Sequence, residues 1–260
     1  MPAYYLDNLL NHYLTSTDQI VGNLTREYSK QHLDLKKQQT QTWIDTAEIF
    51  KMLFNDTKSK IPNIKDWGLL YEYKIPRRAK RIDVVLLSKN LIFILEVKNH
   101  QDSYNSVDIA QLEDYCLDLR DFHFECKDRI IIPILLCTNA PVIQNEISKS
   151  DDFVQNTLFA NAINLSEIIQ STVNLFSDKI DNISYEDWNN SRYSPTPTII
   201  EMAQTLYAGQ SVSEISRHGA DNLTDTTNAV LDAIKQAQAT NSKIICFITG
   251  IPVLEKLWPV

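Results

Sequence analysis

Two short segments, residues 81–87 and 91–98, constrain this chain most, because both are mostly apolar and carry only a few charged residues. Short apolar runs of this length predict β-strands, along which successive side chains point to opposite faces. The three residues between them, Ser88-Lys89-Asn90, predict a tight hairpin. If Lys89 and Asn90 form a two-residue turn, Ser88 pairs with Leu91, and this pair sets the register of the whole hairpin.

Counting outward from that turn brings two pairs of charged residues face to face, Asp83 with Glu96 and Arg81 with Lys98. Directly opposed residues have Cβ atoms about 4.5–5.5 Å apart, so both carboxylates converge on one face. A shift of the register by one residue would separate them. The other face is wholly apolar and is expected in the core; it comprises Ile82, Val84, Leu86, Leu91, Phe93, Leu95 and Val97.

Two carboxylates this close repel each other unless a cation lies between them. Carboxylate oxygens suit a hard divalent ion, so Asp83 and Glu96 predict a Mg²⁺ or Mn²⁺ site. Such an ion activates water and neutralises charge on a phosphodiester. Lys98 follows on the same face, where it can orient that water or stabilise the developing negative charge. The alternative is a buried salt bridge between one carboxylate and Arg81 or Lys98.

A helix predicted over residues 107–122 adds two polar side chains to this picture. Gln111 and Tyr115 lie four residues apart and therefore share one face of that helix. If this face turns toward the carboxylates, Gln111 supports the metal site. Tyr115 is then expected to contact the nucleic-acid backbone.

The order of the predicted elements indicates a three-layer α/β domain, with a mixed central sheet flanked by helices. Residues 1–40 predict one or two surface helices, which are extra to the core. The core elements are a helix at 41–55, strands at 67–75, 81–87 and 91–98, the helix at 107–122 and an apolar strand at 130–137. Further helices are predicted at 151–159, 165–176, 198–208 and 226–238.

Asp83, Glu96-Val97-Lys98 and the segment from Gln111 to Tyr115 together resemble the PD-(D/E)XK nuclease superfamily in its RecB-like branch. That branch pairs D…ExK with Q-x-x-x-Y on the next helix. The resemblance implies a restriction-endonuclease-like core at about residues 41–140 and a metal-dependent endo- or exodeoxyribonuclease. Ile82 stands where the superfamily usually has proline.

The same resemblance implies a further metal ligand, Glu48, on the first helix of the core. A solvated helix glutamate is the alternative for this residue. Glu72, in the first strand, is another candidate for the site.

Charge and composition limit the kinds of partner that the chain can bind. A net charge of -8 excludes a wholly cationic surface for nucleic acid. A short basic stretch nevertheless enters the Asp83 strand, so Arg78, Lys80 and Arg81 are expected to contact phosphates of DNA or RNA. No apolar run is long enough for a membrane span, no secretory signal is visible, and the 4 cysteines are irregularly spaced. A cytoplasmic protein with free thiols is therefore expected.

The last residues resemble an interrupted phosphate-binding loop. An apolar strand is predicted at 243–249, and Gly250 and Lys256 have the spacing of a P-loop. Glu255 and Leu257 replace the second glycine and the hydroxyl residue, so no ATP binding is expected. With suitable codons, a one-base shift of frame turns residues 253–259 into Gly-Ala-Gly-Lys-Thr-Leu-Ala. We therefore hypothesise that the chain is the front part of a longer nuclease–helicase, shortened by a frameshift.

With that restoration, most of the chain resembles the bacterial Schlafen-like nuclease–helicase proteins, notably at residues 72–76, 81–83 and 193–197. The resemblance implies a nuclease domain at 1–190. At 191–260 it implies a helical linker and the first strand of a truncated helicase domain. It is compatible with a homodimer, a helicase partner and a role in defence against foreign DNA. The alternative function is a catalytically inactive module that binds nucleic acid or protein and regulates a helicase.

Overall fold

A computed structural model describes residues 3–31, 37–76, 80–88, 90–149, 152–176 and 183–194, with residues 232, 233, 235–237 and 239. Contacts divide the chain into two units, Met1–Ser194 and Pro195–Val260. The described residues of the second unit are helical and coincide with the end of the helix predicted at 226–238. The helix predicted at 198–208, the strand at 243–249 and the P-loop-like tail lie outside the described residues.

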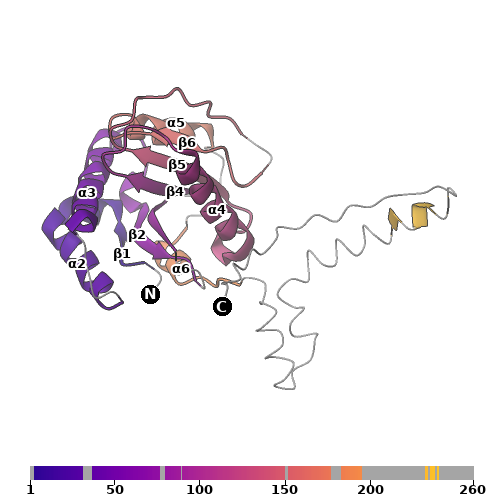
Figure 1. The fold of residues 1–260 in the computed structure, drawn as a ribbon, viewed down its shortest axis with the longest axis horizontal. Coiled ribbons are helices and arrows are strands. Elements are labelled where there is room, and N and C mark those ends of the chain that lie inside the picture. Colours follow the sequence, from indigo (N-terminus) through magenta and orange to yellow (C-terminus); the bar gives the residue numbers. More distant parts are fainter. Residues whose placement is uncertain are drawn as a thin grey trace, which may run out of the picture. The chain divides into compact units, whose positions relative to one another are not determined.

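The first unit is built on a mixed sheet of six strands, which lie side by side in the order of the sequence (Figure 1). Neighbours from β1 to β4 are antiparallel, whereas β4, β5 and β6 are parallel. The strands are β1 (Tyr5–Asn8), β2 (Gly68–Lys74), β3 (Arg81–Leu87), β4 (Leu91–Lys98), β5 (Ile130–Cys137) and β6 (Leu158–Ala160).

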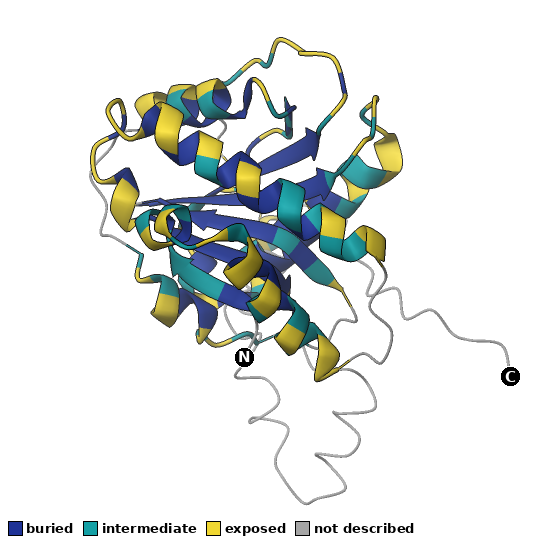
Figure 2. Cartoon of the chain, turned by 90° about the vertical axis from the view of Figure 1, so that its left-hand side faces the viewer, coloured by how far each residue is buried: buried dark blue, intermediate teal, exposed yellow. Residues whose placement is uncertain are grey.

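Helices cover both faces of this sheet, as Figures 1 and 2 show, and their outward sides are exposed while the strands are buried. The α-helices are α1 (Leu9–Leu14), α2 (Thr17–Ser29), α3 (Lys37–Thr57), α4 (Ser106–Phe122), α5 (Leu165–Leu175) and α6 (Tyr185–Asn189); short 3₁₀ turns η1 and η2 span Ile64–Asp66 and Phe124–Cys126. The predicted three-layer α/β fold is confirmed, and it is consistent with a restriction-endonuclease-like core.

Two hydrophobic clusters fill the spaces between the layers. The first joins α1, α2, α3 and α5 to one face of the sheet, through residues that include Leu9, Ile20, Leu24, Trp43, Phe50, Leu165, Tyr71, Val84, Phe93 and Leu95. The second joins α4 and α6 to the other face, through residues that include Leu112, Cys116, Leu119, Trp188, Leu70, Tyr73, Val85, Ile92 and Ile94. Helix α2 is therefore part of the core and not only a surface helix.

The hairpin of β3 and β4 has the predicted register. The Ser88 amide donates to the Leu91 carbonyl at 3.0 Å, and pairing continues from Leu87 with Ile92 to Val84 with Leu95. The alternation of faces then breaks, because Ile82 lies in the same cluster as Val85 and not with Val84. The prediction that Ile82 shares the face of Val84 was wrong.

The neighbouring strand shows the cause of this break. Glu72 of β2 stands opposite Asp83 and has a left-handed backbone, with φ of 53°. Leu70 and Tyr73 consequently lie in one cluster although they are three positions apart in the strand. At the Glu72–Asp83 position, the regular alternation of side chains between the two faces is therefore interrupted in both strands. The carboxylates of Glu72 and Asp83 lie at this interruption.

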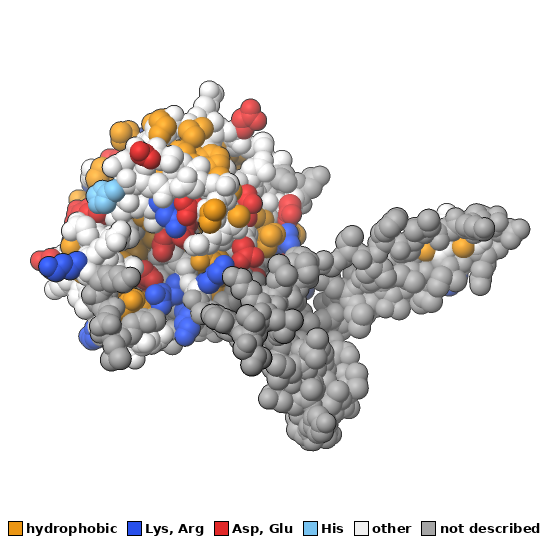
Figure 3. Space-filling view, in the orientation of Figure 1, with side chains coloured by type: hydrophobic (Ala, Val, Ile, Leu, Met, Phe, Trp, Pro, Cys, Tyr) orange, Lys and Arg blue, Asp and Glu red, His pale blue; other side chains and the backbone are white. Residues whose placement is uncertain are grey.

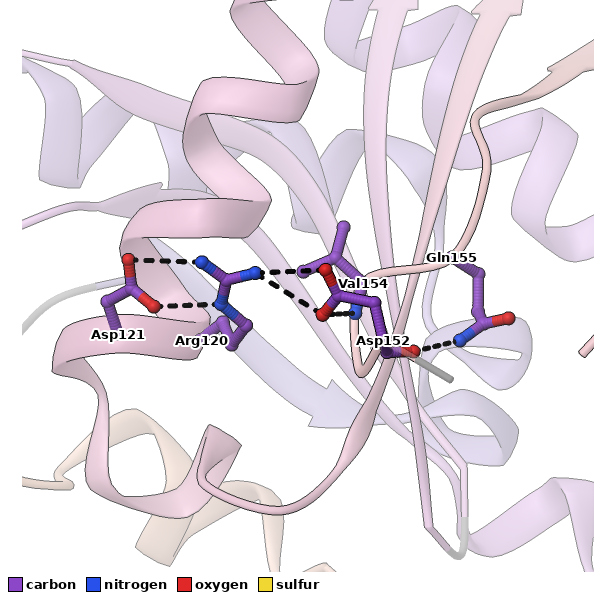
Figure 4. Close-up of polar contacts among 5 residues, drawn as sticks. All are labelled: Arg120, Asp121, Asp152, Val154 and Gln155. Carbon is purple, nitrogen blue, oxygen red and sulfur yellow. Dashed lines mark hydrogen bonds and ion pairs between the residues drawn. The ribbon is translucent and has the colours of Figure 1, made fainter. Parts of the chain in front are cut away.

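The helix predicted at 151–159 was also wrong. Val154 forms an isolated bridge with Ile131, and β6 pairs in parallel with β5. The backbone groups on the free edge of β5 need partners, and this segment supplies them. The Arg120 guanidinium at the end of α4 contacts Asp121 Oδ1 at 2.8 Å and Asp152 Oδ2 at 3.2 Å, as Figure 4 shows. The contact with Asp152 holds this segment against α4. Asp152 Oδ1 in turn accepts from the Val154 amide at 3.3 Å.

No helix in the described part of the chain is long and apolar enough to cross a membrane. Cys116, Cys126 and Cys137 are buried free thiols. Cys246 lies outside the described residues.

Candidate functional site

The candidate site lies where the open end of the β3–β4 hairpin meets the first turns of α4. Asp83 and Glu96 are the next residues outward from the last pair of the β3–β4 ladder, Val84 and Leu95. A continued ladder would match Val97 with Ile82. Instead, the Val97 amide donates to Asp83 Oδ2 at 2.8 Å. This bond fixes the Asp83 carboxylate beside β4.

The two carboxylates lie in an environment that disfavours their charge. Burial raises the pKa of Asp83 well above its usual range, and the neighbouring charges of Glu96 and Glu72 add to this effect. Burial also raises the pKa of Glu96, although the Lys98 ammonium opposes it. Desolvation is the largest cause of both shifts, and nearby acids add to it, namely Glu96 and Glu72 for Asp83 and Asp108 and Glu72 for Glu96. A cation placed between them would remove the conflict.

Glu96 has one carboxylate oxygen in contact with partners and one without. Gln111 Nε2 donates to Glu96 Oε1 at 2.7 Å, and Lys98 Nζ lies 2.9 Å from the same oxygen. Glu96 is only 4% exposed. Its Oε2 atom is buried and has no hydrogen-bond partner among the described residues. A buried carboxylate oxygen without a partner is costly, so this atom is the one best suited to a ligand.

Lys98 is held by a second acid that the sequence analysis did not single out. Asp108, in the first turn of α4, has Oδ1 at 3.0 Å from Lys98 Nζ. Gln101 Nε2 donates to its other oxygen at 3.0 Å. Burial opposes the charged form of Lys98, but Glu96 and Asp108 outweigh it and raise the pKa of the ammonium. Asp108 lies three residues before Gln111 on the same helix face, and this spacing was a signal available in the sequence.

The Asp108 carboxyl is itself stabilised in its charged form. Burial works against ionisation, but hydrogen bonds from Gln101 and Lys98 hold the pKa of Asp108 below its usual value. Lys98 is therefore an ammonium group fixed between two carboxylates.

Tyr115 faces the carboxylates from α4, but its ring is buried. The residue is 3% exposed and belongs to the cluster beneath α4. Burial, followed by the charges of Glu96 and Asp83, raises the pKa of its hydroxyl. Lys80 Nζ lies 5.5 Å from the ring centroid and 3.6 Å from Asp114 Oδ2. The ring of Tyr115 is thus part of the core, and its expected contact with the nucleic-acid backbone stays a prediction.

Glu72 forms a second buried acidic centre on the other face of the sheet. It accepts from Trp43 Nε1 at 2.8 Å, Gln39 Nε2 at 3.0 Å and Arg81 Nε at 2.9 Å. Arg81 also lies over the rings of Tyr4 and Tyr28, at 5.2 and 5.5 Å from their centroids. Arg81 is thus bound to Glu72, and the ladder of β3 and β4 ends at Val84 with Leu95, so the expected pairing of Arg81 with Lys98 is not found. The expected phosphate contact of Arg81 stays a prediction.

The structure does not place Glu48 with the other acids. Its side chain is 55% exposed, lies 4.0 Å from Lys51 Nζ and accepts a hydrogen bond from the Thr17 hydroxyl of α2. The α3 acid that reaches toward the end of β4 is Asp45, one turn earlier, which accepts from Asn99 Nδ2 at 2.9 Å. Helix α3 turns its Glu48 side toward α2, so the structure does not bring Glu48 to the carboxylate pair. Arg78 lies outside the described residues.

A cavity of about 590 Å³ opens beside Lys98. The first turns of α3 form one wall, and the end of β4 with the loop at 99–101 forms the other. On the face seen in Figure 3, basic and acidic side chains lie side by side between the helical layers. The cavity therefore lies next to the candidate site and shares Lys98 with it.

The carboxylates of the candidate site form a small set of ligands for a metal ion. Within the described ranges, no group of three or more His, Cys, Asp and Glu side chains is arranged to hold one. Mg²⁺, however, is usually bound through one or two carboxylates, with waters and substrate phosphates completing its shell. Asp83 and the unpartnered Glu96 Oε2 match that smaller requirement.

Comparison with known families gives one match, to the nuclease-related domain (NERD), over residues 48–130. This domain is a PD-(D/E)XK-like nuclease domain, so the broader part of the resemblance is confirmed. The matched segment contains Asp83, Glu96, Lys98 and Gln111. No curated protein and no solved structure gave a significant match.

Proposed function

We propose that this nuclease-related chain hydrolyses phosphodiester bonds of DNA, or of RNA, with the help of Mg²⁺ or Mn²⁺. The observation that carries the proposal is the pairing of a buried, unpartnered Glu96 Oε2 with the nearby Asp83 carboxylate. Burial disfavours the charged form of both acids, and the charge of Glu96 adds to this cost for Asp83; a divalent cation is a ligand that relieves both.

The protein side chains have separate tasks in this proposal. Asp83 and Glu96 hold the ion, and the Val97 amide keeps the Asp83 carboxylate in place at 2.8 Å. Gln111 fixes Glu96 through its other oxygen at 2.7 Å. Lys98, an ammonium group within reach of the same centre, stabilises negative charge that develops on the phosphate. When bound, a divalent ion supplies Lewis-acid stabilisation and lowers the pKa of the attacking water.

A structural salt bridge is the competing explanation for these residues, and the Lys98–Glu96 contact of 2.9 Å fits it in part. It leaves two facts without an explanation. Asp83 has no such close ion pair among the described contacts, and Glu96 Oε2 has no partner. A hairpin evolved only for stability would do better with apolar side chains at these positions.

The experiment is a cleavage assay with plasmid and single-stranded DNA and with RNA, in Mn²⁺, in Mg²⁺ and in chelator. We expect the protein to cleave only when Mn²⁺ or Mg²⁺ is present. Asp83→Ala and Lys98→Ala are expected to abolish it while thermal unfolding still shows a folded protein. Glu48→Ala, at an exposed position of α3, is the matched control and is expected to cleave normally. Unchanged cleavage by Asp83→Ala or Lys98→Ala would refute the assignment.

The wider setting rests on the resemblance of most of the chain to the bacterial Schlafen-like nuclease–helicase proteins, and residues 191–260 carry its helicase part. We propose that this part joins the nuclease to a helicase, with a role in defence against foreign DNA, and that a homodimer is a compatible assembly. Sequencing the source gene tests the link. The absence of a helicase-like continuation in the alternative frame would contradict it.

A further inference from the structure

The cavity beside Lys98 differs in charge from the rest of the molecule. Its α3 wall carries Lys37, Gln38 and Gln41, and its opposite wall carries Lys98, His100 and Gln101. None of the described residues that line it is acidic, although the chain as a whole has a net charge of -8. Several lining side chains already contact acids outside the lining: Lys98 contacts Glu96 and Asp108, and Gln41 donates to Asp45. Lys37 has no such ion pair among the described residues, so it is the lining cation that can attract an anion.

The position of the cavity links it to the proposed reaction. Lys98 links the two, since its ammonium contacts Glu96 at 2.9 Å and the residue is one of those that line the cavity. Glu96 is 4% exposed and is not itself among the lining residues. A nucleotide in the cavity would therefore lie next to the carboxylates, on the far side of Lys98. Its phosphate would be at the Lys98 end, and its sugar and base would occupy the cavity.

The volume limits what can enter. A space of about 590 Å³ is in the range of sites for small ligands, roughly 300–1,000 Å³. It suits one nucleotide unit with water and is far too small for a double helix. The Gln38 amide is a suitable partner for the edge of an unpaired base, whereas Gln41 and Gln101 already donate their Nε2 groups to Asp45 and Asp108.

The rim of the cavity is held in a fixed shape. His100 has a left-handed backbone, with φ of 62°, and its amide donates to Thr138 Oγ1 at 2.8 Å. Asn99 is tied to Asp45 of α3 at 2.9 Å. These contacts connect the loop after Lys98 to both α3 and the end of β5. The cavity is therefore a built feature, as a specific subsite requires.

From these observations we propose that the cavity binds an unpaired nucleotide next to the cleaved phosphate, so that the substrate is a single-stranded nucleic acid. The inference rests on the proposed nuclease function and assigns its substrate class. Lys37 contacts a phosphate of the strand, and the Gln38 amide contacts the base. A duplex must first unpair a nucleotide to use the site, which costs free energy that a single strand does not lose.

The test measures binding without cleavage. Fluorescein-labelled oligonucleotides of the same sequence, as single-stranded DNA, single-stranded RNA and a blunt DNA duplex, are titrated with the full chain in EDTA. Fluorescence anisotropy gives the dissociation constants over a range of salt concentrations. We expect at least one single strand to bind at least about tenfold more tightly than the duplex. The DNA and RNA arms show which sugar is preferred.

Two variants locate the binding in the cavity. Lys37→Glu is expected to weaken single-strand binding about tenfold and to reduce the slope of log K against log salt by about 0.7, the value for one phosphate contact in a single strand. Lys65→Glu makes the same charge change at an exposed position of η1, before the first residue of β2, and is expected to bind as the wild type does. Gln38→Trp, at an exposed position on the cavity wall, is expected to weaken binding by filling the space.

The outcomes separate this inference from the proposed function. If the duplex binds as tightly as both single strands, or if Lys37→Glu and Lys65→Glu bind alike, the inference is overturned, whatever the cleavage assay shows. If the expected binding pattern is found and no cleavage occurs with Mn²⁺ or Mg²⁺, the nuclease proposal fails while the nucleotide subsite stands.

Discussion

Asp108 Oδ1 lies 3.0 Å from the Lys98 ammonium, whose other carboxylate partner, Glu96 Oε1, is 2.9 Å away. Asp108 is in turn held by Gln101 at 3.0 Å. The ammonium is thereby fixed by one residue of the hairpin and one residue of α4. This arrangement makes Asp108 a positioning residue, because it acts on Lys98 and not directly on a substrate.

Replacing Asp108 by asparagine is expected to lower kcat by about 10–100-fold, the usual effect of removing a partner that orients a site residue. The KM for a single-stranded substrate is expected to change little, since Asp108 does not contact it. Steady-state cleavage kinetics would show this split. Asp102→Asn, at an exposed position of the loop before α4, is the control and should retain the wild-type kcat. A normal kcat for Asp108→Asn would remove the positioning role.

Glu72 is expected to be a stability residue. It is 5% exposed and accepts from Trp43, Gln39 and Arg81. Glu72→Gln leaves the Arg81 guanidinium without its carboxylate, and breaking a buried pair costs about 3–5 kcal/mol. We expect urea unfolding to show a loss of about 3 kcal/mol in the free energy of unfolding. This is the lower end of the range, because Arg81 keeps 26% of its side-chain surface exposed. Glu48→Gln, on the exposed side of α3, is expected to change stability by less than about 0.5 kcal/mol.

Two substitutions of Tyr115 distinguish a role in the core from a contact with nucleic acid. Because the ring is buried beneath α4, Tyr115→Ala is expected to lower the free energy of unfolding by about 3–5 kcal/mol. Tyr115→Phe keeps the ring and is expected to bind a single-stranded oligonucleotide with the wild-type affinity in EDTA. Weakened binding by Tyr115→Phe, without loss of stability, would instead support the contact inferred from the resemblance.

Two buried histidines predict how stability depends on pH. Burial lowers the pKa of His12 and of His123 to about 4. In the unfolded chain these groups have pKa values of about 6.5. As pH falls below about 6.5, the unfolded state therefore binds protons that the native state does not. Each histidine then removes about 1.4 kcal/mol of stability per pH unit until its folded pKa is reached.

The measurement is the free energy of unfolding in urea between pH 7 and pH 4.5. His12→Gln is expected to remove about half of the histidine contribution to the slope. His100 has a side chain that is 74% exposed, so His100→Gln should leave the slope unchanged. Equal slopes for the wild type and His12→Gln would show that His12 is not held neutral in the native state.

The sequence alone predicted the parts that depend on short spacings. The period of two along β3 and β4, together with the two-residue turn, placed Leu87 with Ile92 and Val84 with Leu95. The four-residue spacing on α4 put Gln111 and Tyr115 on the side of the carboxylates. A period or a tight turn fixes geometry within a few residues, so these features needed no knowledge of distant segments.

Contacts between distant segments were decided by the tertiary structure. The edge strands β1 and β6 form because the free edges of β2 and β5 need hydrogen-bond partners, and neither short segment has a strong pattern of its own. The rotation of α3 about its axis likewise decided between Asp45 and Glu48, since both lie on one amphipathic helix.

The site itself was thus determined at two levels. The hairpin sequence by itself set Asp83 and Glu96 on neighbouring strands, because a residue's position in a two-residue period follows from counting. Only the folded chain brought Asp108 into contact with Lys98 and placed Glu72 near Asp83. It also formed the cavity between α3 and the end of β4. These depend on how helices pack on the sheet, and packing angles follow from the complete set of side chains in the core rather than from any single segment.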